Sequence, residues 1–298
     1  MKKEKEPFRI VGTDYQEEKP LATRNKRHFK RMPIVSGIFL SLIVFGCLGA
    51  ELIITHNPTY MYLEHYSTAP NSEFYFGTDT MGRDIFSMIW YGGRISLYIG
   101  VLATIISTFI AIIYGTISGT AKAWIDNGMM RLNEILLSLP NILMIIFVQA
   151  MIGKQTPNAI AVVIGVTSWM GISKVVRTEV RQLRNREYVL ASKCMGGGFF
   201  HILRKHFMPN LFVAIMFMVI MNIGGAIAAE STLSFLGIGL PTDIVSWGSM
   251  LSLAQNALLT KNWWLIVIPG LFLIITILCI TNIGEYIQSE MTKKQSNF

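Results

Sequence analysis

The chain has 298 residues, of which 52% are hydrophobic and 15% are charged, and its mean hydropathy is +0.46. This balance excludes an ordinary soluble domain. The formal net charge of +8 is explained by membrane topology and attraction to anionic headgroups, so it gives no reason to expect nucleic-acid binding.

Six uncharged stretches predict transmembrane helices. Each is about 17 to 27 residues long, and an α-helix needs roughly 20 residues to cross the hydrocarbon core. We therefore expect an all-α, polytopic membrane protein, which is favoured over a soluble protein with six buried core helices. In chain order the stretches are 34–50, 95–121, 135–153, 155–173, 208–229 and 262–284.

These stretches divide the chain into four parts. Residues 1–33 form a basic tail, and residues 34–94 hold the first transmembrane helix and an external segment. Residues 95–285 form the transmembrane core, and residues 286–298 form a second tail. The parts are expected to belong to one membrane-embedded unit flanked by two polar ends.

Short helices are expected between some of the spans. Asp84 is a suitable cap for one of them, and two glycines at 92–93 are expected to bend the chain into the second span. Another helix is expected over 126–139, with Asp126 as its N-cap and Pro140 ending it before the third span.

Lysine and arginine are unevenly distributed between the two sides of the predicted membrane. Of the 26 basic residues, only Arg83, Arg94, Lys154 and Lys261 fall on one side. The positive-inside rule therefore places both termini and the segment 186–210 in the cytoplasm.

The segment 186–210, REYVLASKCMGGGFFHILRKHFMPN, interrupts the hydrophobic sequence with a polar and apolar hairpin. Two short helices, about 188–195 and 199–206, are expected on either side of three glycines that permit a sharp turn. The segment is too short to enclose a core, so its apolar side chains need cover from a partner protein or from the membrane face. These side chains are Tyr188, Val189, Leu190, Met195, Phe199 and Phe200.

The sequence carries no motif for catalysis or nucleotide binding. The phosphate loop G-x-x-x-x-G-K-[ST] is missing, and no group of Cys and His has metal-ligand spacing. We therefore expect no catalytic residue, no metal site and no cofactor on this chain. Charges inside the predicted spans are nearly missing, which argues against ion-coupled transport and suggests that energy enters through the hairpin from another protein.

Three blocks resemble those of type I ABC-transporter permeases of the peptide/nickel family. The hairpin is similar to the family signature E-A-A-x-x-x-G-(x)9-I-x-L-P. The match places E-A-A at residues 190–192, the glycine at Gly196 and the closing proline at Pro209, with departures at Leu190, Ser192, His206 and Met208.

The other two blocks lie in the expected external segments. Residues 76–97, FGTDTMGRDIFSMIWYGGRISL, resemble the block G-T-D-x-x-G-R-D-x-x-S-R-x-x-x-G-x-R-x-S-L, with Met88 in place of an arginine. Residues 228–251, AAESTLSFLGIGLPTDIVSWGSML, resemble the block E-x-x-L-S-F-L-G-L-G. The resemblance extends over about 34–285, and its block order is similar to that of the C-type subunits of oligopeptide systems.

This resemblance implies a type I ABC permease architecture with cytosolic coupling helices, in the plasma membrane of a prokaryote. It implies a function in ATP-driven peptide import, in which this chain lines the path and is not itself an enzyme. The implied partners are a homologous second permease subunit, two cytosolic ATPases that hold ATP and magnesium, and an extracellular or periplasmic peptide-binding protein. Membrane lipid surrounds the chain.

The resemblance also implies site residues. Those expected to couple to the ATPases are Tyr188, Leu190, Ala191, Ser192, Gly196, Gly197, Phe199, His206 and Pro209. Those expected at an external elbow or gate are Gly77, Asp79, Arg83, Asp84, Arg94, Glu230, Ser234 and Gly237. A structural elbow is favoured over substrate contact for the first external block. Glu230 is expected either to bind a ligand amine or to pair with a basic neighbour, and a structural role is favoured.

Alternatives remain at two levels. Within the family, nickel, dipeptide and glutathione importers share these blocks with oligopeptide importers. Outside it, an ion-coupled secondary carrier would transport alone under an ion gradient, and a membrane scaffold subunit would bind partners and transport nothing.

Overall fold

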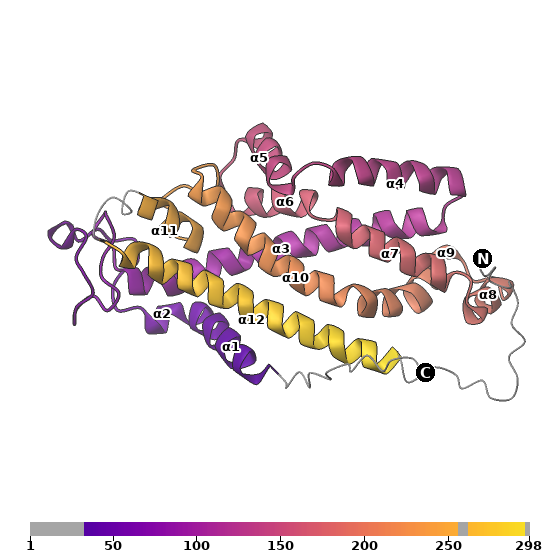
Figure 1. The fold of residues 1–298 in the computed structure, drawn as a ribbon, viewed down its shortest axis with the longest axis horizontal. Coiled ribbons are helices and arrows are strands. Elements are labelled where there is room, and N and C mark those ends of the chain that lie inside the picture. The colour runs from indigo at the N-terminus through magenta and orange to yellow at the C-terminus, as the bar shows by residue number, and fades with distance from the viewer. Residues whose placement is uncertain (1–32, 256–261, 296–298) are drawn as a thin grey trace, which may run out of the picture. The chain divides into compact units, whose positions relative to one another are not determined.

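The computed structural model describes residues 33–255 and 262–295, and no β-strand is present among them. The expected all-α architecture is confirmed. The helical elements are α1 (Ile34–Leu48), α2 (Ala50–Ile53), the 3-10 turn η1 (Leu63–His65), α3 (Ile85–Thr120), α4 (Ala123–Leu137), α5 (Asn141–Ile152), α6 (Pro157–Thr167), α7 (Met170–Leu183), α8 (Glu187–Cys194), α9 (Phe199–Ile202), the π-helical turn η2 (Leu203–Phe207), α10 (Met208–Phe235), α11 (Trp247–Leu253) and α12 (Trp264–Gln295) (Figure 1). The expected tail 1–33 lies outside the described residues, apart from Pro33.

Three helices in the described part of the chain are each long and apolar enough to cross a membrane: α3, the continuous helix Phe199–Phe235, and α12. Two bent pairs bring the number to five if each pair is one span. Helices α4 and α5 meet at an angle of 91°, and α6 and α7 at 47°. The first of the six expected spans is the 15-residue helix α1.

The third and fourth expected spans are therefore not single straight helices. Pro140 stands between α4 and α5 as expected, because proline lacks the N–H that a continuing helix would use. The stretch 155–173 is interrupted at Ser168 and Trp169. The uncharged composition predicted the lengths of these stretches, but it did not predict the break at Ser168 and Trp169.

The expected bend at Gly92 and Gly93 is absent, and α3 is one helix of 36 residues. Both glycines serve close packing instead. A Cβ atom on Gly93 would lie 2.4 Å from the sulfur of Cys47, and one on Gly92 would lie 2.9 Å from Val245. The expected boundary at residue 94, between the external segment and the transmembrane core, therefore falls inside α3. Asp84 does cap this helix, accepting hydrogen bonds from the N–H groups of residues 86 and 87.

Helix α3 is central to the packing, with α1, α6, α7 and α10 against it, while α10 also packs on α12 (Figure 1). Small residues allow these close approaches. Helices in a membrane commonly associate in this way, because surrounding lipid is as apolar as their side chains and close packing must replace the hydrophobic effect. Cβ atoms on Gly115 and Gly119 would lie 2.6 and 2.8 Å from Val176 and Val180 of α7. Such contacts fix α7, which leads directly into the glycine-rich hairpin.

Candidate functional site

The glycine hairpin, residues 186–210, lies at the end of the bundle opposite α11 (Figure 1). Helix α8 agrees with the expected first arm to within one residue. The second arm differs, because α9 has four residues and continues through the π-helical turn η2 into α10. The wider turn ends at Phe207, two residues before Pro209, which lies in the first turn of α10 and lacks an N–H donor.

The turn itself depends on Gly196, which has φ +85°. An L-residue with a side chain is strained in this left-handed region. Gly197 is restricted differently, because its N–H donates to the carbonyl of Ser192 at 2.8 Å and a Cβ there would meet that carbonyl at 2.7 Å. Both expected glycine positions are therefore required by local geometry.

The hairpin has a buried inner face. Val189, Ile202 and Phe207 are 0%, 4% and 2% exposed and pack into one apolar cluster with α3, α7 and α10. Ser192 is also buried. The expectation that Val189 needs external cover is therefore wrong, since the bundle itself provides that cover.

The outer face is left open, and we call it the hairpin surface. Its apolar members are Tyr188, Leu190, Met195, Phe199 and Phe200, with exposed fractions from 45% to 82%. The Tyr188 ring lies 5.5 Å from the His206 ring, so these two expected site residues do meet. Ala191 is exposed beside them. Exposed aromatic groups gathered on a short hairpin are typical of a protein-binding surface.

The first expected elbow, at the other end of the bundle, is a closed structural junction. The Asp79 carboxylate accepts hydrogen bonds at 2.8 Å from Nε and the backbone N–H of Arg83. Arg83, 2% exposed, also donates from Nη1 to the carbonyl of Thr242 at 3.1 Å. Gly77 is needed here because its φ is +75° and a Cβ would lie 2.6 Å from the Thr68 carbonyl. This geometry favours the structural interpretation of the block.

Asp84 is equally enclosed. It is 0% exposed, and its Oδ2 accepts from the hydroxyl of Ser87 at 2.5 Å and that of Thr55 at 3.1 Å.

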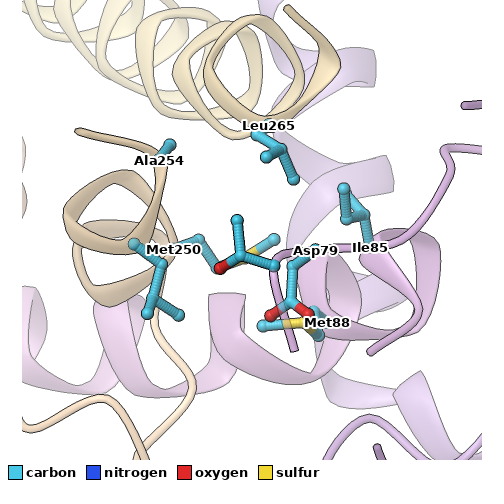
Figure 2. Close-up of a pocket in the computed structure, with 8 residues that line it drawn as sticks. Asp79, Ile85, Met88, Met250, Ala254 and Leu265 are labelled. Carbon is cyan, nitrogen blue, oxygen red and sulfur yellow. The ribbon is translucent and has the colours of Figure 1, made fainter. Parts of the chain in front are cut away.

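A cavity of only about 10 Å³ lies beside this junction. Figure 2 shows Asp79, Ile85 and Met88 on one side of it and Met250 and Ala254 on the other. Such a volume holds at most about one water molecule, so no substrate fits there.

Arg94 joins the end of α1 to α3. It donates from Nε to the carbonyl of Cys47 at 2.6 Å and from Nη2 to that of Leu48 at 2.9 Å, and it pairs with Glu51 at 3.0 Å. A cation at a helix C-terminus stabilises the otherwise unpaired carbonyls. Its contacts place Arg94 in a helix-to-helix junction apart from the other expected elbow residues.

Glu230 lies within α10, is 0% exposed, and is surrounded by serine hydroxyls. Ser234 and Ser246 donate to Oε1 at 3.0 and 2.9 Å. Ser96 of α3 and the neighbouring Ser231 donate to Oε2 at 3.2 and 3.4 Å. No ion pair to Glu230 is found within residues 33–255 and 262–295, so the expected basic neighbour is replaced by hydroxyl donors.

Three of these hydroxyls also accept hydrogen bonds from the backbone. Ser234 accepts from the N–H of Leu240, Ser246 from that of Ser249, and Ser96 from that of Trp247, at 3.0, 3.0 and 3.2 Å. Each hydroxyl proton is therefore free to point at the carboxylate. Glu230 thus holds α3, α10 and the segment carrying α11 in one network. Gly237, with φ +76°, turns the chain between these parts.

Replacing Glu230 by alanine is expected to lower the free energy of unfolding by about 2–4 kcal/mol, because four hydroxyls lose their acceptor in a buried site. Glutamine, which keeps one acceptor oxygen, is expected to cost less. Thermal unfolding of the purified protein in detergent measures both. Glu73→Ala, at an exposed position, is the control. Equal stability of Glu230→Ala and the control would show that the network contributes nothing.

An ion-pair cluster that the sequence did not predict joins α3, α4 and α7. Lys122, not Asp126, occupies the N-cap of α4, so the cap expectation is wrong. Asp126 instead accepts from Arg177 at 2.5 and 2.6 Å, from Arg181 at 3.2 Å and from Ser118 at 2.6 Å. Sequence reasoning had no signal for this pairing, because the partners are about fifty residues apart.

Comparisons with known proteins bear on what this bundle does. The family described as binding-protein-dependent transport system inner membrane component matches residues 110–293. The chain belongs to this family. The matched range holds the glycine hairpin, the Asp126 cluster and Glu230. This family member is therefore a multi-pass membrane component of a transport system.

Individual relatives cover most of the chain. It is 36% identical to the dipeptide transport system permease protein DppC of Bacillus subtilis over 90% of this chain and 84% of the relative. It is 33% identical to the oligopeptide transport system permease protein OppC of the same organism, over 89% and 86%. For the oligopeptide permease protein OppC of Haemophilus influenzae the identity is 36%, over 76% and 73%.

The fold is also found in a solved structure. Inward-facing MetNI methionine ABC transporter gives a TM-score of 0.52 at 16% identity, covering 68% of this chain and 96% of that chain. The expected ABC permease fold is confirmed by this likeness.

Proposed function

We propose that the chain is a permease subunit of an ATP-driven peptide importer, in which it lines the translocation path. The observation that carries this proposal is its similarity, over about nine tenths of its length, to permeases named for dipeptide and oligopeptide transport. The dipeptide relative is the more identical of the two, so both peptide classes belong in the first test. Nickel and glutathione are the competing substrates.

Coupling is assigned to the hairpin surface. Its exposed aromatic side chains dock into a groove on a cytosolic ATPase, and two such ATPases supply ATP and magnesium. ATP binding draws the ATPases together, the hairpin follows, and α7 and α10 transmit the movement to the path. A homologous second permease completes the path, and an external binding protein delivers the peptide. Catalytic groups for hydrolysis belong to the ATPases.

The decisive experiment reconstitutes this chain in liposomes with a second permease subunit, two ATPases and a peptide-binding protein from the same organism. Uptake of a labelled dipeptide and a labelled pentapeptide should require ATP and the binding protein. Nickel and glutathione should not compete. Uptake by this chain alone under an ion gradient would favour a secondary carrier, and binding of partners without any uptake would favour a scaffold.

The proposed orientation has both termini and the glycine hairpin in the cytoplasm, which the distribution of basic residues supports. Cys194 reports on it directly, because it is exposed while Cys47 and Cys279 are buried. A membrane-impermeant maleimide is expected to label Cys194 in inverted vesicles stripped of ATPases and not in intact spheroplasts.

The matched control moves the thiol to the opposite side. In the double variant Cys194→Ser, Lys154→Cys, the new thiol lies at an exposed position in the loop after α5. It should be labelled in spheroplasts and protected in inverted vesicles. The reverse pattern for the two proteins would invert the proposed topology.

A further inference from the structure

A cavity of about 200 Å³ lies where both bent helix pairs meet α10, and we call it the helix-break cavity. Its lining residues are Leu136, Leu137, Leu139, Asn141, Met144, Thr167, Ser168, Met170, Gly171, Asn222, Gly225 and Ala229. They come from the junction of α4 and α5, the break between α6 and α7, and one face of α10. The volume fits a short stretch of an extended chain rather than a whole drug-sized ligand.

The two breaks place non-helical backbone beside this cavity. Neither Pro140 before α5 nor Trp169 before α7 provides a side-chain cap, so backbone N–H groups at both helix starts lack that partner. Non-helical backbone at membrane depth is stable only when protein buries it or when it lines a water-filled cavity. Two independent helix pairs break at the same cavity.

Asn222 has an orientation that its neighbours fix. Ser107 is fully buried and donates its hydroxyl proton to the carbonyl of Thr104 at 3.0 Å. It must therefore accept the hydrogen bond from Asn222, which donates from Nδ2 at 2.7 Å. The amide oxygen Oδ1 is left as an acceptor, and no partner for it is found in the described chain. Ser168, which also lines the cavity, has no hydrogen bond from its hydroxyl within those same residues.

The lining contains no lysine, arginine, aspartate or glutamate. A charged terminus or side chain of a ligand would lose its hydration here without meeting an opposite charge. The uncharged N–H and C=O groups of a ligand can instead form hydrogen bonds with the side chains of Asn222, Ser168 and Asn141. Gly225 contributes no side chain to the wall of the cavity, and a Cβ atom placed on it would meet nothing within 4 Å.

We propose that the helix-break cavity is a contact site for the main chain of the transported peptide, with Asn222 Oδ1 accepting a hydrogen bond from a backbone N–H. This assignment rests on the proposed peptide-import function. Recognition of main-chain groups is independent of side-chain identity, so one site serves peptides of varied sequence.

The first test fills the cavity after folding. In a Cys194→Ser background, Gly225→Cys is assembled into the complete reconstituted transporter and then modified with maleimides of increasing size. Uptake of a labelled peptide is expected to fall at least tenfold with the bulkiest reagent, and excess peptide should slow the modification. Gly270→Cys, on α12 and also with open space at its Cβ, is the control that should retain uptake. Full uptake by the bulky Gly225 adduct would overturn the site.

The second test removes one backbone donor at a time. A tripeptide and its N-methylated analogues are compared at saturating binding protein, with their affinity for that protein measured separately. At one methylated position, the wild type is expected to lose roughly three- to tenfold in uptake rate, the usual worth of one hydrogen bond. Asn222→Ala should bring the ratio of the two rates close to one at that position.

The two proposals fail in different ways. If the wild type takes up neither peptide, the import function is wrong and the site falls with it. If the wild type takes up both and Asn222→Ala keeps the wild-type ratio, only the site is overturned. An unchanged unfolding temperature of Asn222→Ala separates lost recognition from lost folding.

Discussion

Replacing Ala191 by arginine is expected to lower peptide uptake by roughly 30-fold or more while ATP hydrolysis by the complex continues. Ala191 is exposed on α8, so the substitution disturbs nothing in the bundle. It places a charge among the aromatic groups of the hairpin surface, where an apolar partner groove would have to desolvate it. Uptake and hydrolysis measured on the same proteoliposomes give the coupling ratio.

Ala191→Leu is the matched comparison, because it enlarges the side chain without adding charge. It is expected to retain most of the coupling. If the hairpin surface instead lies on lipid headgroups, arginine should be tolerated or should strengthen binding to anionic lipid. Wild-type coupling and normal ATPase association in Ala191→Arg would therefore contradict docking.

Much of the fold followed from composition because lipid imposes length and polarity on a spanning helix. The stretches 95–121, 208–229 and 262–284 each correspond to one long helix, and the first arm of the hairpin and the Asp84 cap were expected correctly. These features depend on residues close in sequence. A cap requires only its own helix start, and the turn at Gly196 requires only a residue that tolerates a positive φ.

The expectations that were wrong concern features that depend on contacts between residues far apart in the sequence. Gly92 and Gly93 have the composition of a bend, yet they lie inside one continuous helix and allow Val245 and Cys47 to approach it closely. For Glu230 a structural role was favoured, with a basic neighbour as its partner, but its carboxylate oxygens accept instead from serines in two other parts of the chain. No local pattern reports such pairings.

The helix-break cavity illustrates the same limit for function. Asn222 stands in a hydrophobic stretch, and nothing in its immediate sequence distinguishes it from a polar residue that merely bonds a neighbouring helix. Its Nδ2 is used by Ser107, 115 residues away, and its Oδ1 has no partner among residues 33–255 and 262–295. The sequence predicted a path-lining subunit but could not say which residues line the path.

Replacing Asp126 by alanine is expected to lower the free energy of unfolding by about 2–3 kcal/mol and to reduce uptake. The Asp126 side chain is 6% exposed and carries two hydrogen bonds from Arg177 that fix α7 against α4. Removing one member of a buried ion pair leaves the remaining charges uncompensated, although the partial exposure of Arg177 and Arg181 moderates the cost. Thermal unfolding in detergent measures the first effect.

A second ion pair on the same helix gives the control. Arg131 and Glu134 are 3.6 Å apart with side chains 83% and 52% exposed, so Glu134→Ala should change stability by less than about 1 kcal/mol. Asp126→Asn keeps the shape and an acceptor for Ser118 while removing the charge, and its cost should lie between the two. Because α7 leads directly into the glycine hairpin, loosening it should also lower the number of peptides moved per ATP. If Asp126→Ala lost stability and kept that number, the cluster would hold the fold without transmitting movement.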